Sequence, residues 1–258
     1  MLVTDNVIRL LGRYSEGLRL TAEHGPASGV VCEYAYENTP QGSGALGRLI
    51  DRTFLHLSAC DTIRQRIHTT KELVAEIVAA RRAARATTLI LDVAAGTGRY
   101  LRELAHEHHG DDLEIICHDR DPRQVTLARQ LAAAEQLQRF TCSVGDATDD
   151  SSYLTRHDPN VVLAVGLFQY LRHDDAVRTV MRLALSHLAP GGCFLCTTLT
   201  DVPSRLGRLE TNGFAARPAA RAPETIATWL RATGFLRIDQ RFSHPNGFAL
   251  IGWKPDEA

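Results

Sequence analysis

The residues with the clearest chemical potential form a glycine-rich segment near the middle of the chain. It reads Leu91-Asp-Val-Ala-Ala-Gly-Thr-Gly-Arg-Tyr100 and overlaps the end of an apolar run at 88–93. Glycines let the backbone approach a ligand closely, and a helix that begins here offers backbone N–H groups. A buried strand, a glycine-rich turn and a helix in this order are typical of a nucleotide site at the switch point of a doubly wound sheet.

The spacing within this segment argues against two common nucleotide loops. A dinucleotide loop has a third small residue where this chain has Leu101. A phosphate-binding P-loop has a lysine after its glycines, and none follows here. Asp92 stands at the end of the apolar run, before the glycines. These features favour a loop for S-adenosylmethionine over a pyrophosphate loop.

Two further acids follow the next two predicted strands. Asp119 ends an apolar run at 113–118, where a carboxylate can accept hydrogen bonds from both hydroxyls of a ribose. Asp146 follows a run at 139–143, where it can face the amino group of an adenine. Each acid alone is an ordinary loop residue, but three acids at three successive strand ends, the first beside its glycines, make a sharper signal.

Alternating strands and helices must position these residues. The pattern from 88 to 234 predicts a parallel sheet wound on both faces, in an α/β fold. A closing hairpin predicts that the last strand runs antiparallel. The expected strands cover 88–93, 113–118, 139–143, 161–166, 193–198, 235–242 and 247–253, and the expected helices cover about 99–109, 122–138, 174–188 and 223–233. Residues 1–85 carry helical apolar stripes and are expected to form a helical lid on a ligand-binding domain at 86–258.

Over residues 88–253 the chain resembles the class I S-adenosylmethionine-dependent methyltransferases. The resemblance covers the Asp92, Gly96 and Gly98 loop, Asp119, the Gly145-Asp-Ala147 triplet, Leu188-Ala-Pro-Gly-Gly192 and the terminal hairpin. It implies a Rossmann-like seven-stranded sheet whose last strand is antiparallel. It also implies a cofactor site in which the loop borders the methionine part, Asp119 holds the ribose, and Asp146 and Ala147 hold the adenine. The cofactor site expected from the loop, its neighbours and the fourth strand end comprises Asp92, Ala94, Gly96, Gly98, Asp119, Arg120, Asp146, Ala147, Gly166 and Phe168.

A narrower resemblance, to a bacterial branch of predicted methyltransferases, covers parts of the N-terminal region. It rests on Glu33–Asn38, Gly42–Phe54, Ile63–Arg66 and Gly166–Phe168. The Gly-Gln-Pro-Trp-like segment of that branch is replaced here by Thr198-Leu-Thr-Asp-Val-Pro203.

The candidate catalytic residues are Tyr170, Tyr36 and His173. An aromatic face attracts a positive sulfur by a cation–π interaction of roughly 0.5–2 kcal/mol, and Tyr170 and Tyr36 are the aromatic candidates, with Phe168 and Tyr34 as alternatives. His173 is a candidate base, as are Asp174 and Glu33, although His173-Asp-Asp175 also fits a helix start with acids in its first turn. His106, His108 and His109 fit a solvated helix end, and Cys193 and Cys196 point to opposite faces of one strand, so no metal is expected.

Composition limits the class of protein. The chain has 258 residues with 29 basic and 30 acidic side chains, a formal net charge of −1. This balance argues against a nucleic-acid partner. No uncharged stretch approaches the ~18 residues of a membrane span, and no secretory pattern begins the chain. Six scattered cysteines fit buried thiols, so a cytoplasmic enzyme with a small-molecule substrate is expected, as a monomer or a homodimer.

Three functions remain open from the sequence. The first is methyl transfer to a small molecule by in-line attack. The second is intramolecular cyclisation of S-adenosylmethionine to azetidine-2-carboxylate and methylthioadenosine, since bacterial azetidine-2-carboxylate synthases are built on the fold that the resemblance implies. The third is a non-catalytic subunit that binds S-adenosylmethionine. A nicotinamide dehydrogenase is disfavoured by Leu101 and by the terminal hairpin.

Overall fold

The computed structural model describes residues 10–26, 28–108, 110, 112–199, 219–244 and 247–256. Several sequence predictions lie outside these ranges. They are the start of the first helical stripe at 1–9, His109, and most of the divergent segment at 198–203. Among the described residues, no helix is both long enough and apolar enough to cross a membrane.

The described residues form two compact units, which divide after Gln65. The first holds α2 (Glu16–His24), α3 (Gly29–Glu37), α4 (Gly44–Leu55) and the start of α5 (Ser58–Ala83). The second begins at Arg66 and holds the rest of α5 and every described strand. The sequence expectation places the corresponding boundary at 85, the end of the helical region.

The second unit is built on one seven-stranded sheet in the order β3-β2-β1-β4-β5-β7-β6. Neighbours from β3 to β5 are parallel, whereas β7 runs antiparallel to both β5 and β6. The predicted α/β class, the winding and the antiparallel last strand are therefore confirmed. The strands are β1 (Thr88–Asp92), β2 (Leu113–Asp119), β3 (Phe140–Val144), β4 (Val161–Ala164), β5 (Cys193–Leu199), β6 (Arg237–His244) and β7 (Gly247–Trp253).

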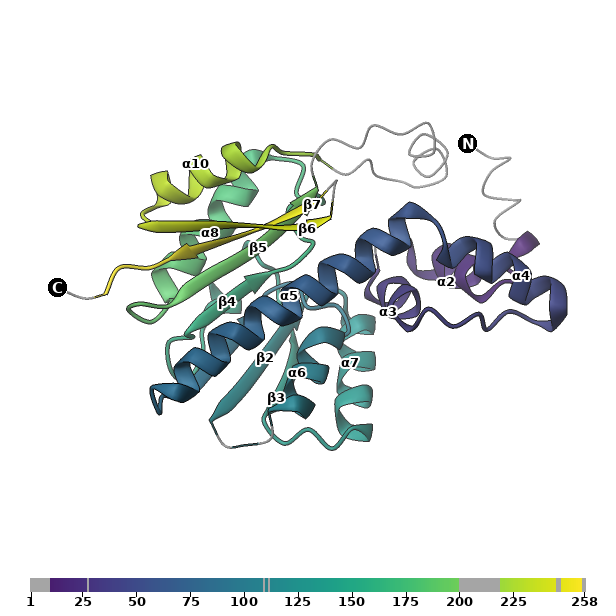
Figure 1. Cartoon of the computed structure of the whole chain (residues 1–258), viewed down its shortest axis with the longest axis horizontal. Helices are drawn as coiled ribbons and strands as arrows, with labels where there is room; N and C mark the ends of the chain where they lie inside the picture. The colour runs from purple at the N-terminus through teal and green to yellow at the C-terminus, as the bar shows by residue number, and fades with distance from the viewer. Residues whose placement is uncertain are drawn as a thin grey trace. The chain divides into compact units, whose positions relative to one another are not determined.

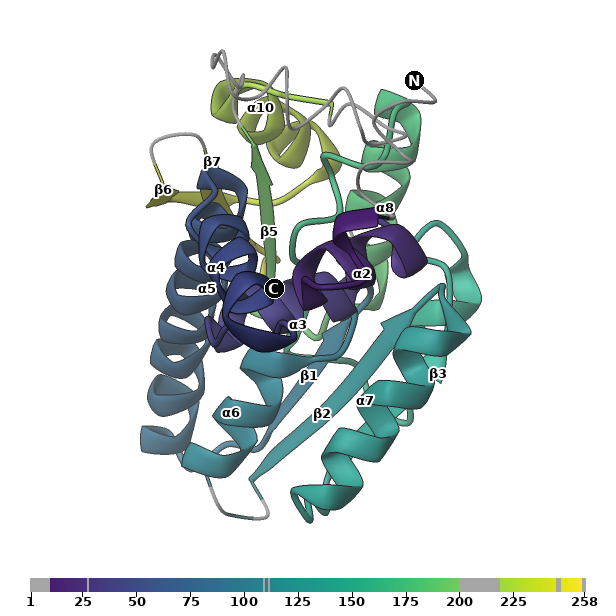
Figure 2. The same cartoon turned by 90° about the vertical axis from the view of Figure 1, so that its right-hand side faces the viewer.

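Helices cover both faces of this sheet (Figures 1 and 2). On one face, α6 (Arg99–Glu107) packs on β2, and α7 (Pro122–Ala134) packs on β2 and β3. On the other face, α8 (Asp174–His187) packs on β5 and on the short 3₁₀ helix η1 (Asp150–Tyr153), and α10 (Pro223–Thr233) packs on α8, β6 and β7. The inner strands are buried on both sides, which is why β4 and β5 read as continuous apolar runs.

Helix α7 ends four residues earlier than the sequence pattern predicts. Gln136 adopts a left-handed backbone with φ of 57°. The amides of Gln136 and Leu137 donate to the carbonyls of Ala133 and Ala132, at 3.1 and 3.0 Å. These two bonds close the helix as a Schellman motif, which usually has a glycine at the left-handed position. The predicted end at 138 is therefore wrong, because this chain has glutamine at the capping position.

The first unit is organised around the buried carboxylate of Asp51 on α4. Its Oδ1 accepts from the Ser15 hydroxyl at 2.5 Å and from the Gly17 amide at 3.2 Å. Its Oδ2 accepts from the Tyr34 hydroxyl at 2.5 Å and from the Gln41 amide at 3.0 Å. Burial alone would raise the pKa of Asp51, but these donors hold the pKa below its ordinary value. One carboxylate thus joins α2, α3 and α4.

The same unit shows why two glycines of the narrower resemblance are needed. A Cβ on Gly42 would lie 2.4 Å from the backbone of Gly47, and a Cβ on Gly47 would lie 2.3 Å from the carbonyl oxygen of Tyr14. Both approaches are closer than real Cβ atoms tolerate. These two glycines of the resemblance therefore have a packing explanation within their own unit.

Candidate active site

The glycine-rich loop joins β1 to α6 and is anchored by Asp92. This side chain is completely buried. Its Oδ1 accepts from the Ala94 amide at 2.9 Å, and its Oδ2 accepts from the hydroxyl of Tyr100, which reaches back from the first turn of α6. Both ends of the loop are therefore tied to one carboxylate.

The two glycines of the loop take a left-handed backbone, with φ of 58° at Gly96 and 67° at Gly98. Gly98 is also the N-cap of α6. A Cβ there would lie 3.1 Å from the ring of Phe140 and 3.4 Å from the sulfur of Cys117. Gly98 thus lets α6 begin close against β2 and β3, which is a structural need independent of any ligand.

Asp119, at the end of β2, contacts the loop directly. Its Oδ2 accepts from the Gly96 amide at 2.9 Å, and its Oδ1 accepts from the Asp121 amide at 2.9 Å. A carboxylate can accept about four hydrogen bonds. Each oxygen of Asp119 therefore keeps capacity for a further donor, such as a hydroxyl group.

Asp146 lies one strand further along the same edge. Asp119 and Val144 are register partners, and the Gly145 amide donates to the Asp119 carbonyl at 3.1 Å. The exposed carboxylate of Asp146 accepts from the amide and hydroxyl of Thr148, at 2.8 and 2.7 Å. These bonds, with a smaller contribution from the Arg120 charge, lower the pKa of Asp146. Three acids at three neighbouring strand ends are thus a feature of the structure.

The pKa of Asp92, the buried acid at the end of β1, is far above its ordinary value. Burial raises the pKa of Asp92 to about 7 against the opposing hydrogen bonds from Tyr100 and Ala94, and the Asp119 carboxylate adds to the rise. Burial and the Asp92 carboxylate likewise raise the pKa of Tyr100 well above its ordinary value. The site therefore contains an acid that changes charge near neutral pH beside a phenol that stays protonated.

The residues after β4 lie on a tight turn. Gly166 has φ of 69°, and its amide donates to the Thr197 hydroxyl at 2.7 Å. Phe168 is completely buried in the core, with its ring centroid 6.2 Å from that of Phe194, so its side chain packs rather than lines a surface. Tyr170 is exposed, and its amide closes a turn with the Leu167 carbonyl at 2.9 Å.

His173 is the exposed N-cap of α8, with Asp174 and Asp175 in the first turn. The alternative interpretation of this triplet as a helix start is confirmed. Arg221 fixes the segment before α8, because its guanidinium donates to the Phe168 carbonyl at 2.7 Å, the Leu171 carbonyl at 2.8 Å and Asp174 at 2.9 Å. Sequence reasoning missed Arg221, which follows a region without a clear pattern.

Tyr36 and Glu33 lie on α3 of the first unit, both half-buried. The neighbouring Tyr34 is buried and bonded to Asp51, so its hydroxyl supports that unit. The catalytic assignments of Tyr36, Tyr170 and His173 remain predictions.

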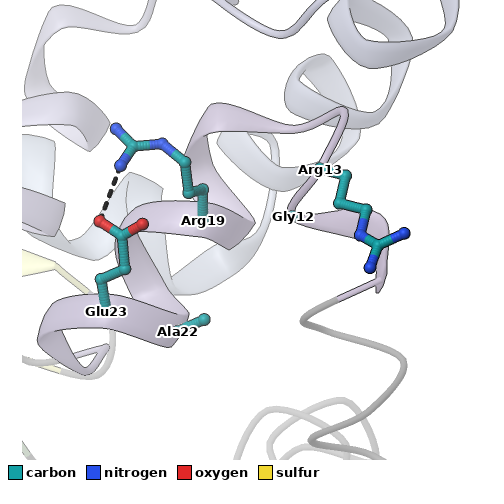
Figure 3. A pocket seen from close by; sticks show the side chains of 5 residues that line it. All are labelled: Gly12, Arg13, Arg19, Ala22 and Glu23. Atoms are coloured by element: carbon teal, nitrogen blue, oxygen red, sulfur yellow. Dashed lines mark hydrogen bonds and ion pairs between the residues drawn. The ribbon is translucent and has the colours of Figure 1, made fainter.

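The first unit has a hollow of about 440 Å³, and Figure 3 shows the side chains that line it. Arg19 within it is paired with Glu16 at 2.5 Å and with Glu23 at 2.7 Å, so its charge is balanced on its own helix. The hollow is lined by Gly12, Arg13, Arg19, Ala22 and Glu23. None of these residues belongs to the predicted cofactor site.

Within the described part of the chain, no group of three or more His, Cys, Asp or Glu residues is placed to hold a metal ion. Five of the six cysteines are buried and Cys32 is half-buried. Burial raises the pKa of both Cys193 and Cys196, which favours the neutral thiol.

Comparison with known proteins finds similarity to a described family and to a curated relative. The model of a family described as "Putative methyltransferase" matches residues 2–243. The "Uncharacterized protein YnbC" of Escherichia coli (strain K12) is 31% identical over 194 residues, which are 74% of this chain and 33% of that protein. The chain thus spans about a third of the length of this relative.

Two solved structures share the fold. A Bordetella parapertussis protein described as a "possible exported protein" matches over 93% of this chain and 84% of its own, with a TM-score of 0.75 and 19% identity. An O-methyltransferase family protein of Burkholderia thailandensis covers 81% of this chain and 63% of its own, with a TM-score of 0.58 and 19% identity.

Proposed function

Because the chain belongs to the family described as "Putative methyltransferase", within the class I S-adenosylmethionine-dependent superfamily, we propose that it is a small-molecule methyltransferase. The observation that carries this proposal is the alignment of Asp92, Asp119 and Asp146 at neighbouring strand ends, with Asp119 hydrogen-bonded to the glycine-rich loop.

The donors and acceptors of this edge fit S-adenosylmethionine. The remaining lone pairs of Asp119 suit the two ribose hydroxyls. Asp146 and Ala147 would border the adenine, and Asp92 with the loop would border the methionine part. The guanidinium of Arg66 lies against Gly166, and its buried Nε has no hydrogen-bond partner, which suits an anionic group. We therefore assign Gly96, Gly98, Ala94 and Arg120 to the surroundings of this ligand.

The chemistry that S-adenosylmethionine supplies is a methyl carbon already activated by a positive sulfur. The chain's task is then to hold the acceptor in line with that carbon and to exclude water. We propose that the ring of Tyr170 faces the positive charge. His173 would accept a proton from an acceptor that needs one, since its exposed imidazole takes no part in capping α8.

The near-neutral charge of the chain favours a small metabolite over a nucleic acid as acceptor. A polyanion would require clusters of unpaired basic residues. Most arginines with described partners are instead engaged by acids on their own unit, as Arg82 is with Asp112 and Arg139 with Glu114.

Two measurements on the purified chain test the proposal. Calorimetry with S-adenosylmethionine tests binding, with Asp119→Ala as the weakened variant and Asp158→Ala, an exposed loop acid, as the control. Mass spectrometry of the adenosyl product, with and without a pool of metabolites, then identifies the reaction. Adenosylhomocysteine formed only with the pool supports methyl transfer.

Other products would replace the proposal. Methylthioadenosine and azetidine-2-carboxylate formed from S-adenosylmethionine alone would identify a cyclase, because the amine of the same molecule would then be the nucleophile. Tight binding without turnover in any pool would identify a non-catalytic binding subunit. No binding at all would refute the assignment of this edge.

A further inference from the structure

Two buried cysteines lie side by side beneath the glycine-rich loop, and the proposed methyl transfer gives neither of them a role. Cys117 on β2 and Cys142 on β3 are register partners in the parallel part of the sheet. Neighbouring strands lie about 4.8 Å apart, which is within the ~4.4–6.8 Å that separates the Cα atoms of a disulfide. Side chains at paired positions point to the same face of a sheet. The two thiols therefore lie next to each other.

A hydrogen bond joins the side chains of Cys117 and Cys142 directly. The two cysteines of β5 differ, because Cys193 and Cys196 point to opposite faces of one strand. Their register partners on the neighbouring strands are Val161, Trp253, Ala164 and Leu250. Among the register pairs of the described strands, cysteine therefore meets cysteine only between β2 and β3.

The surroundings of the two thiols give them different reactivity. The hydrogen bond from Cys117 lowers the pKa of Cys142 against the effect of burial, and the charges of Arg129 and Arg102 lower it further. Arg129 is held beside this residue, since its Nε donates to the Cys142 carbonyl at 2.8 Å. Burial raises the pKa of Cys117 well above its ordinary value, and the hydrogen bond with Cys142 adds to the rise. Cys142 is therefore the better nucleophile, and Cys117 remains a thiol beside it.

Cys142 is also the thiol that a small oxidant reaches more easily. It lies on β3, an edge strand of the sheet. Its exposed fraction is 8%, against 2% for Cys117 and 0% for Cys193. This narrow opening favours a small oxidant such as hydrogen peroxide over a bulky one.

Cys117 connects this pair to the candidate ligand site. A Cβ on Gly98, the N-cap of α6, would lie 3.4 Å from the Cys117 sulfur. Bonded sulfurs are about 2.05 Å apart, much closer than hydrogen-bonded thiols, so a disulfide would draw the two side chains together and change the packing beneath Gly98. In the same loop, the Gly96 amide donates to Asp119 at 2.9 Å. A shift of the loop would therefore reach the acid proposed to hold the ribose.

We propose that Cys142 and Cys117 form a redox site that hydrogen peroxide closes to a disulfide, and that this disulfide weakens the ligand site above it. The Cys142 sulfur attacks one peroxide oxygen, the O–O bond breaks and one water leaves, which gives a sulfenic acid. The Cys117 sulfur then attacks the Cys142 sulfur and displaces its oxygen as a second water. Two thiols and one peroxide thus give one disulfide and two waters. The weaker ligand binding rests on the proposed function, whereas disulfide formation is independent of it.

Peptide mapping by mass spectrometry tests the redox site. The full chain is treated with hydrogen peroxide, and the remaining thiols are alkylated after unfolding. In the wild type we expect a cross-linked pair of peptides that contain Cys117 and Cys142, whereas Cys193 and Cys196 should be alkylated. Dithiothreitol should restore both thiols. Calorimetry should show that the oxidised chain binds S-adenosylmethionine about tenfold more weakly, equivalent to about 1.4 kcal/mol, and that reduction restores the affinity.

Two variants separate the roles of the thiols. Cys117→Ala should stop at the sulfenic acid of Cys142, which a cyclic diketone reagent labels. Cys142→Ala should leave Cys117 as a thiol and should keep its affinity for S-adenosylmethionine after peroxide treatment. Cys193→Ala is the matched control, because it removes a buried strand cysteine that has no cysteine as a register partner. This control should form the disulfide as the wild type does, and thermal unfolding checks the fold of each variant.

Three results would overturn the inference. Peroxide treatment that leaves Cys117 and Cys142 as thiols would show that the pair is not redox-active. A wild-type chain in which Cys142 is oxidised to the sulfinic acid while Cys117 stays a thiol would show that the two do not react with each other. A disulfide between them with unchanged ligand affinity would refute the effect on the loop. If the reduced wild type binds no S-adenosylmethionine, the proposed function itself fails, and peptide mapping still decides whether the disulfide forms.

Discussion

The buried carboxyl of Asp92 makes the free energy of unfolding depend on pH, and a single variant removes this contribution. Burial raises its pKa from 3.8 to about 7. Between about pH 4 and pH 7 the unfolded chain therefore binds fewer protons than the folded chain, and the free energy of unfolding falls as pH rises. At about 1.4 kcal/mol for each pKa unit, the full loss is about 4 kcal/mol above neutral pH.

Asp92→Asn removes this titration and preserves the local geometry. The amide oxygen of asparagine can still accept from the Ala94 amide, and its NH₂ group can donate to Tyr100, because a phenol oxygen both donates and accepts. We therefore expect the variant to resemble the wild type at about pH 4 and to exceed it in stability by a few kcal/mol at about pH 8.

Urea unfolding of the ligand-free chain across this pH range measures the effect, with Asp158→Asn as the control for an exposed loop acid. The difference in unfolding free energy between wild type and Asp92→Asn isolates the contribution of Asp92, because all other groups titrate in both proteins. Parallel pH profiles for these two proteins would refute the reasoning. So would a variant that is less stable at the higher pH, since that would mean an ionised Asp92 is stabilised in the fold.

Four further changes have defined outcomes. Asp119→Ala should weaken binding of S-adenosylmethionine about tenfold or more in calorimetry, by removing the ribose acceptor; unchanged affinity would contradict that role. Gly98→Ala should lower the unfolding free energy by about 1–3 kcal/mol, because the new Cβ meets Phe140 in a left-handed backbone; a neutral result would disprove the close packing. Asp51→Asn should cost about 2–4 kcal/mol at neutral pH, since an NH₂ group would face donors, and the loss should shrink as the pH falls through the lowered pKa of Asp51; a constant difference would count against it. Tyr170→Ala should reduce turnover more than binding, and normal turnover would limit Tyr170 to packing.

The strands and the mainly parallel sheet could be predicted from the sequence because the signals are local. The stretches 89–91 and 193–196 are continuously apolar, as strands buried on both faces require. Asp92, Asp119 and Asp146 stand at or just after the ends of such strands, so strand assignment also placed the acids. The ends of elements could be predicted less well, and α7 shows the reason. Its C-terminal cap is Gln136 in a left-handed backbone conformation, a position at which a glycine would have indicated the helix end.

The contacts between residues that are far apart in the chain could not be predicted from local sequence patterns. Arg66 lies against Gly166 from a position 100 residues earlier in the chain, and Arg221 binds the Phe168 carbonyl from 53 residues later. Periodicity reports which face of one element is buried and says nothing of which distant side chain fills the space. The partnership of Tyr100 with Asp92 is closer, at eight residues, but depends on the turn of the glycine loop.

The position of β7 between β5 and β6 has a consequence for synthesis on the ribosome. The last described strand of the chain is an interior strand of the sheet, and it is the partner that covers the outer edge of β5. During translation β1 to β5 emerge first and can pair in parallel, but β5 then presents unpaired backbone groups until residues 247–253 have left the exit tunnel. Such an exposed apolar edge is a template for aggregation. Removing β7 should therefore affect yield and solubility more severely than removing an edge strand such as β3.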